Sequence, residues 1–162
     1  MRLLRRKASQ QGVQNALDDL AAHGIVEQIS AGGSILNTLN RDHILVPYIV
    51  GIVNLRDELI DRIATIVTEE APGVRRAILF GSLARGNADE ESDIDIALIW
   101  PDEEQQESAQ QNIAVRVDSL TGNACRLLHY TEEEFATLAE RTPELYAAFE
   151  SEGIDLLMTL VR

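Results

Sequence analysis

Apolar and polar residues follow a helical period near the start of the chain and a strand period directly after it. Residues 9–23 place their apolar side chains on one helical stripe, with Ser9 suited to the N-cap and Gly24 to the stop. Residues 25–29 and 35–39 have the composition of two strands, and the glycine-rich residues between them indicate a turn. The expected order is helix, strand, glycine-rich tip, strand.

A longer helical pattern follows at residues 47–70. Pro47 suits the first turn of a helix, and the Ala-Pro-Gly segment at 71–73 is the clearest linker in the chain. Apolar residues recur with a helical period at Ile49, Ile52, Leu55, Leu59, Ile63, Ile66 and Val67. A stripe of this length is more than a small domain covers, so we expect the helix to connect two parts and to form the seam of a homodimer.

Strand and helix patterns then alternate to the end of the chain. The expected elements are a strand at 74–80, a strand at 93–100, a helix at 104–120 and a strand at 124–130. Thr131 and Glu134 form a capping box for a further helix, and Pro143 begins another that Gly153 ends. The pattern predicts an α/β (α+β) protein.

Two carboxylates and a glycine turn concentrate the chemistry of the chain. Asp93 and Asp95 lie on one face of the predicted strand, where they repel each other unless a cation lies between them. Mg²⁺ suits this position because it takes oxygen ligands from one or two carboxylates and from phosphates. The turn at Gly81 and Ser82 offers backbone N–H groups and a hydroxyl to phosphate oxygens. The pattern indicates phosphoryl or nucleotidyl transfer.

The spacing of these residues resembles a known family signature. Residues 81–86 (Gly-Ser-Leu-Ala-Arg-Gly) followed by residues 92–95 (Ser-Asp-Ile-Asp) resemble the DNA polymerase beta-type nucleotidyltransferase superfamily, in particular its minimal branch. The resemblance implies a nucleotidyltransferase fold with a mixed sheet and flanking helices. It assigns nucleotide binding to Gly81, Ser82 and Arg85, and catalysis and metal binding to Asp93 and Asp95.

The same resemblance implies the substrates. The donor would be a nucleoside triphosphate, expected to be ATP, with Mg²⁺ or Mn²⁺ as the metal ion. A nucleoside monophosphate would pass to a hydroxyl acceptor, which in minimal members is often on a partner protein encoded nearby, such as a toxin.

One feature of the family pattern is missing. Active members usually carry a third carboxylate on the next strand, yet residues 124–130 contain no Asp or Glu, and Asp118 falls on the preceding helix. His129 is either a substitute base or an exposed residue at the strand end. A second function therefore stays open, that of a DNA-binding regulator or antitoxin whose transferase domain binds nucleotide or partner without turnover.

The N-terminal pattern resembles part of a bacterial winged helix-turn-helix. In that resemblance residues 9–23 are the recognition helix and the glycine-rich tip is the wing. The residues assigned to DNA are Arg5, Arg6 and Lys7 for phosphates and Gln10, Gln11 and Gln14 for base edges. A full module has two helices before the recognition helix, and only residues 1–6 precede it here, so either the start is truncated or the module is degenerate. The alternative is that residues 1–40 form a cap used for dimerisation. The expected parts are a partial winged helix at 1–43, a long helix and linker at 44–73, and a nucleotidyltransferase domain at 74–162.

The net charge of −13 is unevenly distributed. Residues 1–56 hold six basic and four acidic residues, whereas residues 57–162 hold eight basic and 23 acidic residues, so a polyanion would meet the N-terminal segment. Cys125 is the only cysteine, which excludes an internal disulfide. No apolar run is long enough to span a membrane, and a cytoplasmic protein without membrane contact is expected.

Overall fold

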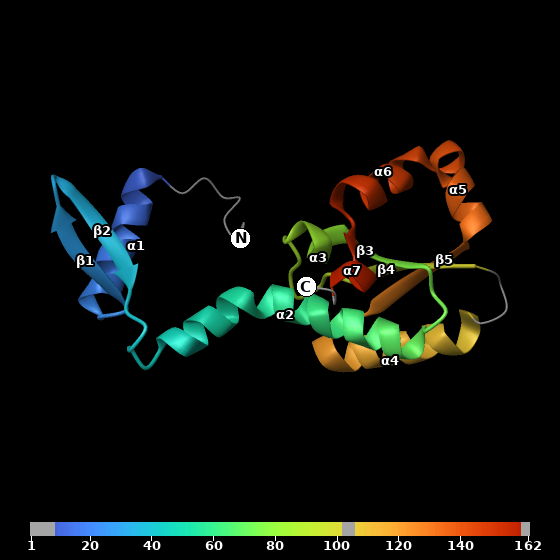
Figure 1. The fold of residues 1–162 in the computed structure, drawn as a ribbon, viewed down its shortest axis with the longest axis horizontal. Helices are drawn as coiled ribbons and strands as arrows, with labels where there is room; N and C mark the ends of the chain where they lie inside the picture. Colours follow the sequence, from blue (N-terminus) through green and yellow to red (C-terminus); the bar gives the residue numbers. More distant parts are fainter. Residues whose placement is uncertain (1–8, 102–105, 160–162) are drawn as a thin grey trace. The chain divides into compact units, whose positions relative to one another are not determined.

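The computed structural model describes residues 9–101 and 106–159 of the chain. These residues fall into two compact units, of which the first ends at Leu55 and the second begins at Arg56. Helix α2 (Val46–Glu70) crosses this division (Figure 1), so it contributes to both units. Within the described ranges, no helix is long and apolar enough to cross a membrane.

The first unit contains a helix, a β-hairpin and the start of α2. Its other elements are α1 (Gln10–Ala22), β1 (Val26–Ala31) and β2 (Ser34–Leu39). The Ser9 hydroxyl caps α1 by accepting the N–H of Gly12 at 3.1 Å. The two strands pair antiparallel, and Gly32 and Gly33 at the tip both have positive φ values. The helix and hairpin expected from residues 9–39 are confirmed.

The first unit buries little apolar surface. Among its described residues only Ile25 and Val46 are buried. Large apolar side chains that are more than one third exposed come from each of its elements and from the loop before α2: Val13, Leu20, Ile29, Ile35, Leu36, Ile44, Leu45, Tyr48, Val50, Ile52 and Leu55. This unit therefore offers a large apolar surface for association.

The second unit is built on a mixed sheet. After α2 its elements are β3 (Arg76–Phe80), α3 (Gly81–Arg85), β4 (Ile94–Trp100), α4 (Gln106–Thr121), β5 (Cys125–Thr131), α5 (Glu132–Arg141), α6 (Pro143–Glu152), β6 (Ile154–Asp155) and α7 (Leu156–Thr159). The strand order is β5-β4-β3-β6. β4 and β5 run parallel, as the α4 crossover allows, while β3 pairs antiparallel with β4 and β6. The expected α/β fold with a mixed sheet and flanking helices is confirmed.

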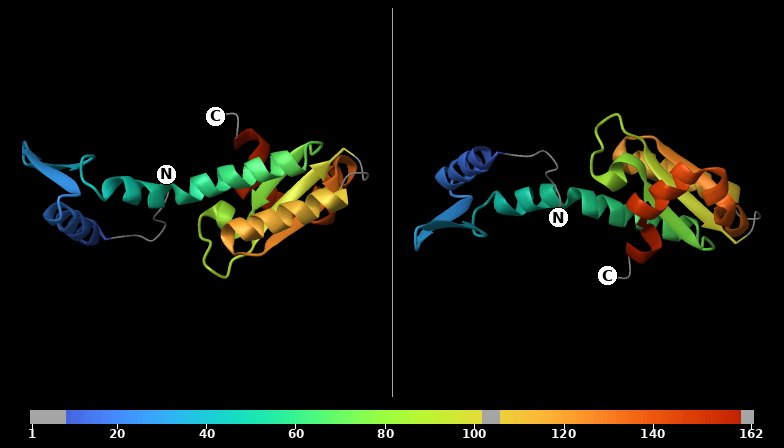
Figure 2. Two further views of the ribbon diagram at one scale, coloured as in Figure 1. Left: turned by 90° about the horizontal axis from the view of Figure 1, so that it is seen from below. Right: turned by 90° about the horizontal axis from the view of Figure 1, so that it is seen from above.

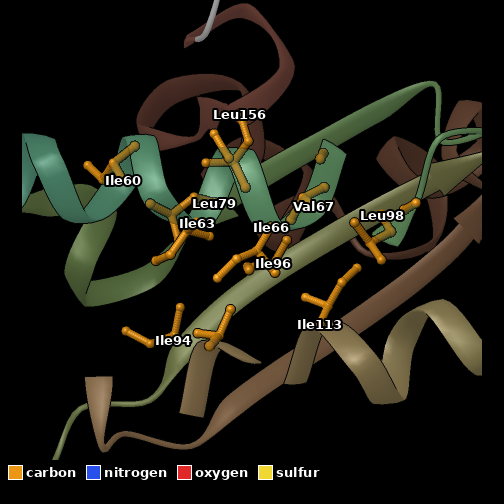
Figure 3. Close-up of a cluster of buried hydrophobic side chains, with 14 of the residues drawn as sticks. Ile60, Ile63, Ile66, Val67, Leu79, Ile94, Ile96, Leu98, Ile113 and Leu156 are labelled. Carbon is orange, nitrogen blue, oxygen red and sulfur yellow. The ribbon is translucent and has the colours of Figure 1, made fainter. Parts of the chain in front are cut away.

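Different helices cover the two faces of this sheet (Figures 1 and 2). The second part of α2 and α4 cover one face, where Ile63, Ile96 and Ile113 are fully buried in the larger core (Figure 3). α5 and α6 cover the other face, whose smaller core contains Phe135 and Phe149. Side chains alternate along a strand, so even-numbered residues of β4 face the larger core and odd-numbered residues face the smaller one.

The apolar stripe of α2 changes its surroundings along the helix. Ile63 and Val67 are fully buried in the second unit, whereas Ile52 and Leu55 in the first unit are 73% and 59% exposed. The long helix expected from residue 47 to residue 70 is confirmed. The start of the helix expected at 104 lies outside the described residues, and the division of the chain into three parts stays a prediction.

Candidate active site

A glycine turn leads from the sheet into the short helix α3. Phe80 ends β3, and Gly81 begins α3 with a φ of 76°. This conformation strains any residue that has a Cβ. Gly86 ends the helix with a φ of 73° and donates its N–H to the carbonyl of Leu83. The two glycines therefore provide the backbone conformations that the turn requires.

Asp93 and Asp95 lie at the start of β4, beside this turn. Asp95 pairs in register with Phe80 of β3, one residue before Gly81. A Cβ placed on Gly81 would collide with the Oδ2 atom of Asp95. The fold therefore brings together the glycine turn and the acidic pair, which lie apart in the sequence.

An arginine on the neighbouring strand contacts the acidic pair. Arg126 of β5 pairs in register with Asp95, and its Nη2 lies 2.8 Å from Oδ2 of Asp93. The Arg126 side chain is 71% exposed and the Asp93 side chain 28% exposed. The Arg126 guanidinium therefore lies beside the acidic pair on the side of β5, which is an edge strand of the sheet.

The electrostatic environment disfavours the charged form of Asp95. Burial raises the pKa of Asp95 above its ordinary value, and the charge of Asp93 raises this pKa too. The positive charges of Arg126 and Arg85 oppose this rise in the pKa of Asp95. A cation bound beside Asp95 would stabilise its carboxylate form.

The acidic pair fits one hard divalent cation. Mg²⁺ is commonly held by one or two carboxylates, with water and substrate phosphates as its other ligands. Among residues 9–101 and 106–159, no group of three His, Cys, Asp or Glu side chains could hold a metal ion. The protein ligands would therefore be Asp93 and Asp95, and the remaining ligands would come from the nucleotide and water. The Asp95 carboxylate fills the space beside Gly81 that a Cβ would need, so the acid lies directly against the turn.

The two other predicted nucleotide-binding residues lie on α3. Ser82 is half-buried in the first turn of this helix. Arg85 is in the last turn, and its Nη1 lies 3.2 Å from Oε2 of Glu152 at the end of α6. Because the charge of Arg85 acts on Asp95, Arg85 lies within electrostatic range of the site.

Arg56 of α2 holds α3 in place. Its Nε donates to the carbonyl of Leu83 at 3.0 Å, and its Nη2 donates to the carbonyl of Ala84 at 2.7 Å. These carbonyls belong to the end of a helix, where backbone acceptors lack partners within the helix. Arg56 therefore provides hydrogen-bond donors to the carbonyl groups at the end of α3, the helix that begins at Gly81.

The sequence did not single out Arg56 or Arg126. The contacts of Arg56 join residues 27 and 28 positions apart, and no local pattern indicates them. Strand alternation in residues 124–130 could have placed Arg126 on one face of β5. It could not have placed Arg126 beside Asp95, because this requires the register between β4 and β5.

The hypothesis that His129 supplies a base is wrong. His129 pairs in register with Leu98, three residues along β5 from Arg126. Alternation along β5 places His129 on the face covered by α2 and α4, opposite the acidic pair. Asp118 does not replace it, because its Oδ1 accepts the N–H of Cys125 at 2.7 Å.

The predicted DNA-binding residues lie in the first unit. Gln10 and Gln11 are exposed and Gln14 is half-buried at the N-terminal end of α1. The amide of Gln11 donates to Asn15 and the amide of Gln14 donates to Asp18, in each case one turn along the helix. Arg5, Arg6 and Lys7 lie outside the described residues.

Comparisons with known proteins identify the second unit. A family model described as "Nucleotidyltransferase domain" matches residues 60–151, which is more than half of the chain. This match includes the glycine turn, the acidic pair and Arg126. No curated protein sequence matches the chain.

Three solved structures resemble the chain at low identity. A toxin-antitoxin with AMP-PNP aligns at 23% identity with a TM-score of 0.45, over 60% of this chain and 71% of that chain. A mutant of the toxin-antitoxin MntA-HpeT aligns at 21% identity and a TM-score of 0.45, with the same coverage. The tri-AMPylated HEPN toxin of Shewanella oneidensis in complex with MNT antitoxin aligns at 20% identity and a TM-score of 0.42, over 62% and 71%.

Proposed function

The chain belongs to the nucleotidyltransferase domain family, a family of enzymes, and we propose that it transfers a nucleoside monophosphate from ATP to a hydroxyl group. The observation that supports this proposal is the position of Asp95 beside Gly81, with Asp93 two residues before it. This arrangement places a site for phosphate oxygens next to carboxylates that suit a divalent cation.

In the proposed reaction the acceptor oxygen attacks the α-phosphorus of ATP. The bond between the α-phosphorus and the bridging oxygen breaks, and pyrophosphate leaves with the electron pair of that bond. Gly81, Ser82 and Arg85 would bind the triphosphate, and Asp93 and Asp95 would hold Mg²⁺ or Mn²⁺, which when bound would neutralise phosphate charge. The proton of the acceptor hydroxyl passes to water or to a group on the acceptor, because His129 lies on the opposite face of the sheet.

We expect the acceptor hydroxyl on a partner protein encoded beside this chain, as the resemblance to minimal members implies. Incubation with α-labelled ATP, Mg²⁺ and that neighbouring protein should label the neighbour. Asp95→Asn should abolish the label, whereas Asp61→Asn, on the exposed surface of α2, should retain it. Labelling by Asp95→Asn at the rate of the unmodified chain would contradict the proposal.

Calorimetry tests nucleotide binding without turnover. ATP should bind when a divalent metal ion is present, and the combined Asp93→Asn and Asp95→Asn substitutions should abolish binding. Equal binding of ATP in excess chelator would show that the acidic pair does not act through a metal ion.

The second candidate function is DNA binding by the first unit. Its support is the polar N-terminal end of α1, where Gln10 and Gln11 are exposed and Gln14 is half-buried, and which the resemblance to a winged helix assigns to base edges. Binding to DNA from the chain's own promoter should weaken steeply as salt rises, and should weaken when Arg5, Arg6 and Lys7 are neutralised. Tight promoter binding without any labelled acceptor would favour a regulator or antitoxin over the enzyme.

A further inference from the structure

Arg126 lies beside both carboxylates of the acidic pair. It pairs in register with Asp95 across the parallel β4–β5 ladder. Its Nη2 lies 2.8 Å from Oδ2 of Asp93, so one of the four oxygens of the acidic pair already faces a positive charge. This argument rests on the proposed function, because it concerns the metal and nucleotide of the same site.

The charges around the acidic pair favour one divalent ion over two. The Arg126 guanidinium already offsets part of the negative charge of Asp93, so the acidic pair has less charge left for cations than an unpaired pair of carboxylates would have. A second divalent ion on the Asp93 side would lie close to the Arg126 guanidinium, and two positive charges repel each other. Two-metal sites place their ions about 3.5–4 Å apart, so a second ion could not be moved far from this guanidinium.

Strand β5 provides no negative charge that would offset this repulsion. Within the described part of the chain, β5 carries Arg126 at the position beside Asp95, and the nearest acid before it, Asp118, accepts the N–H of Cys125. A guanidinium group has five N–H donors in a planar fork that suits phosphate oxygens. Arg126 can therefore pair with Asp93 and still present donors to a bound triphosphate.

We propose that the guanidinium of Arg126 takes the place of a second metal ion, so that the site binds ATP with a single divalent cation. In this arrangement Asp95 and one oxygen of Asp93 hold the cation together with phosphate oxygens, and Arg126 neutralises charge on the β5 side. Arg126 then determines how many metal ions the site binds, and its guanidinium also binds the phosphates.

Electron paramagnetic resonance with Mn²⁺ measures the number of bound ions directly. The probe is an ATP analogue with a methylene bridge between its α- and β-phosphorus atoms, which cannot release a nucleoside monophosphate. The chain should bind one Mn²⁺ with each analogue molecule. Arg126→Asp adds a carboxylate beside Asp95 and should bind two, while Arg126→Lys keeps the positive charge and should bind one.

Analogue affinity provides a second measurement that does not depend on Arg126→Asp being folded. Arg126→Gln should weaken binding by about tenfold or more, because a charge-assisted contact to phosphate is lost, and Arg126→Lys should restore part of it. Arg62→Gln, in which another exposed arginine is replaced, should bind as the unmodified chain does.

Two Mn²⁺ ions per analogue in the unmodified chain would overturn the inference and leave the proposed function standing. Unchanged analogue affinity in Arg126→Gln would also overturn it, because Arg126 would then be only a surface ion pair. Absence of analogue binding at any Mn²⁺ concentration would remove the proposed function itself, and this inference with it.

Discussion

The carboxylate of Asp95 occupies the space beside Gly81 that the Cβ of any other residue would need. Gly81 also has a φ of 76°, a left-handed conformation that costs an L-residue about 1–2 kcal/mol. Position 81 is therefore constrained twice, by its own backbone conformation and by the carboxylate of Asp95 on the neighbouring strand β4.

Gly81→Ala should lower both stability and nucleotide binding. The backbone strain should reduce the free energy of unfolding by about 1–2 kcal/mol, and the new methyl group should displace Asp95 and abolish metal-dependent ATP binding. Gly122→Ala is the matched control, since Gly122 has a φ of 77° with nothing within 4 Å of its added Cβ. Urea denaturation and calorimetry measure the two effects. Equal ATP affinity in the two variants would contradict the role of the Gly81 contact.

Arg56→Ala should destabilise α3 without touching the acidic pair. It removes the side-chain donor to the carbonyl of Ala84 and one of the two donors to the carbonyl of Leu83, which keeps the N–H of Gly86, and the free energy of unfolding should fall by about 1–3 kcal/mol. Amide hydrogen exchange should become faster in α3, and ATP affinity should fall. Arg62→Ala removes an exposed pair with Glu58 and should change stability by less than about 1 kcal/mol. If the two variants have equal stability and equal exchange in α3, Arg56 does not hold this helix.

Cys125 should be unreactive in the folded chain. Burial, followed by the charges of Asp118 and Asp95, raises the pKa of the Cys125 thiol to about 12, and the thiolate is the reactive form. Alkylation at pH 8.5 should be at least about a hundredfold slower in the folded chain than in denaturant. Because the pKa of the Cys125 thiol is higher in the folded chain than in the unfolded chain, the free energy of unfolding should fall as the pH rises from the unfolded pKa toward 12. Cys125→Ala should remove this part of the pH dependence. Equal alkylation rates in the folded chain and in denaturant would contradict the prediction, because the thiol would then be ionised to the same degree in both.

The exposed stripe at the start of α2 should form a homodimer contact. Tyr48, Ile52 and Leu55 of α2 follow one another at spacings of four and three residues, which is the pattern of paired helices, and all three are exposed. Leu45, which is also exposed, lies directly before the helix. Sedimentation at micromolar concentration should detect a dimer. Ile52→Glu should weaken it by at least about tenfold, because a charge would enter the apolar seam.

Asn54→Glu is the control for this dimer, because it places the same side chain on α2 outside the stripe and should leave association unchanged. A chain that stays monomeric at every concentration would contradict the prediction.

Sequence patterns predicted the elements of the fold because their signals are local. The Ser9 cap, the paired glycines of the hairpin and the capping box at Thr131 each depend on contacts within a few residues, and the structure contains all three. The strand order and the parallel pairing of β4 with β5 depend on contacts between distant segments, and the resemblance to a family indicated only a mixed sheet.

The residues of the site were likewise predicted where their signals are local and missed where they depend on contacts between distant segments. Alternation placed Asp93 and Asp95 together, and the family resemblance placed Gly81 with them, as the structure does. Arg126 was missed, and the base role was kept open for His129, for one reason, which is that the face and register of β5 relative to β4 are tertiary properties. The alternative, that His129 is an exposed residue, agrees with the structure. A strand of seven residues without an acid did not reveal which of its side chains would face the acidic pair.

The larger core lies on the face of the sheet opposite the acidic pair. Residues such as Ile63, Ile96 and Ile113 specify the fold there, while Asp93 and Asp95 lie on the other side of β4. Selection on folding and selection on turnover therefore act on largely separate sets of residues. Arg126 belongs to neither core, so a substitution there can change the charge beside the acidic pair without removing a core side chain.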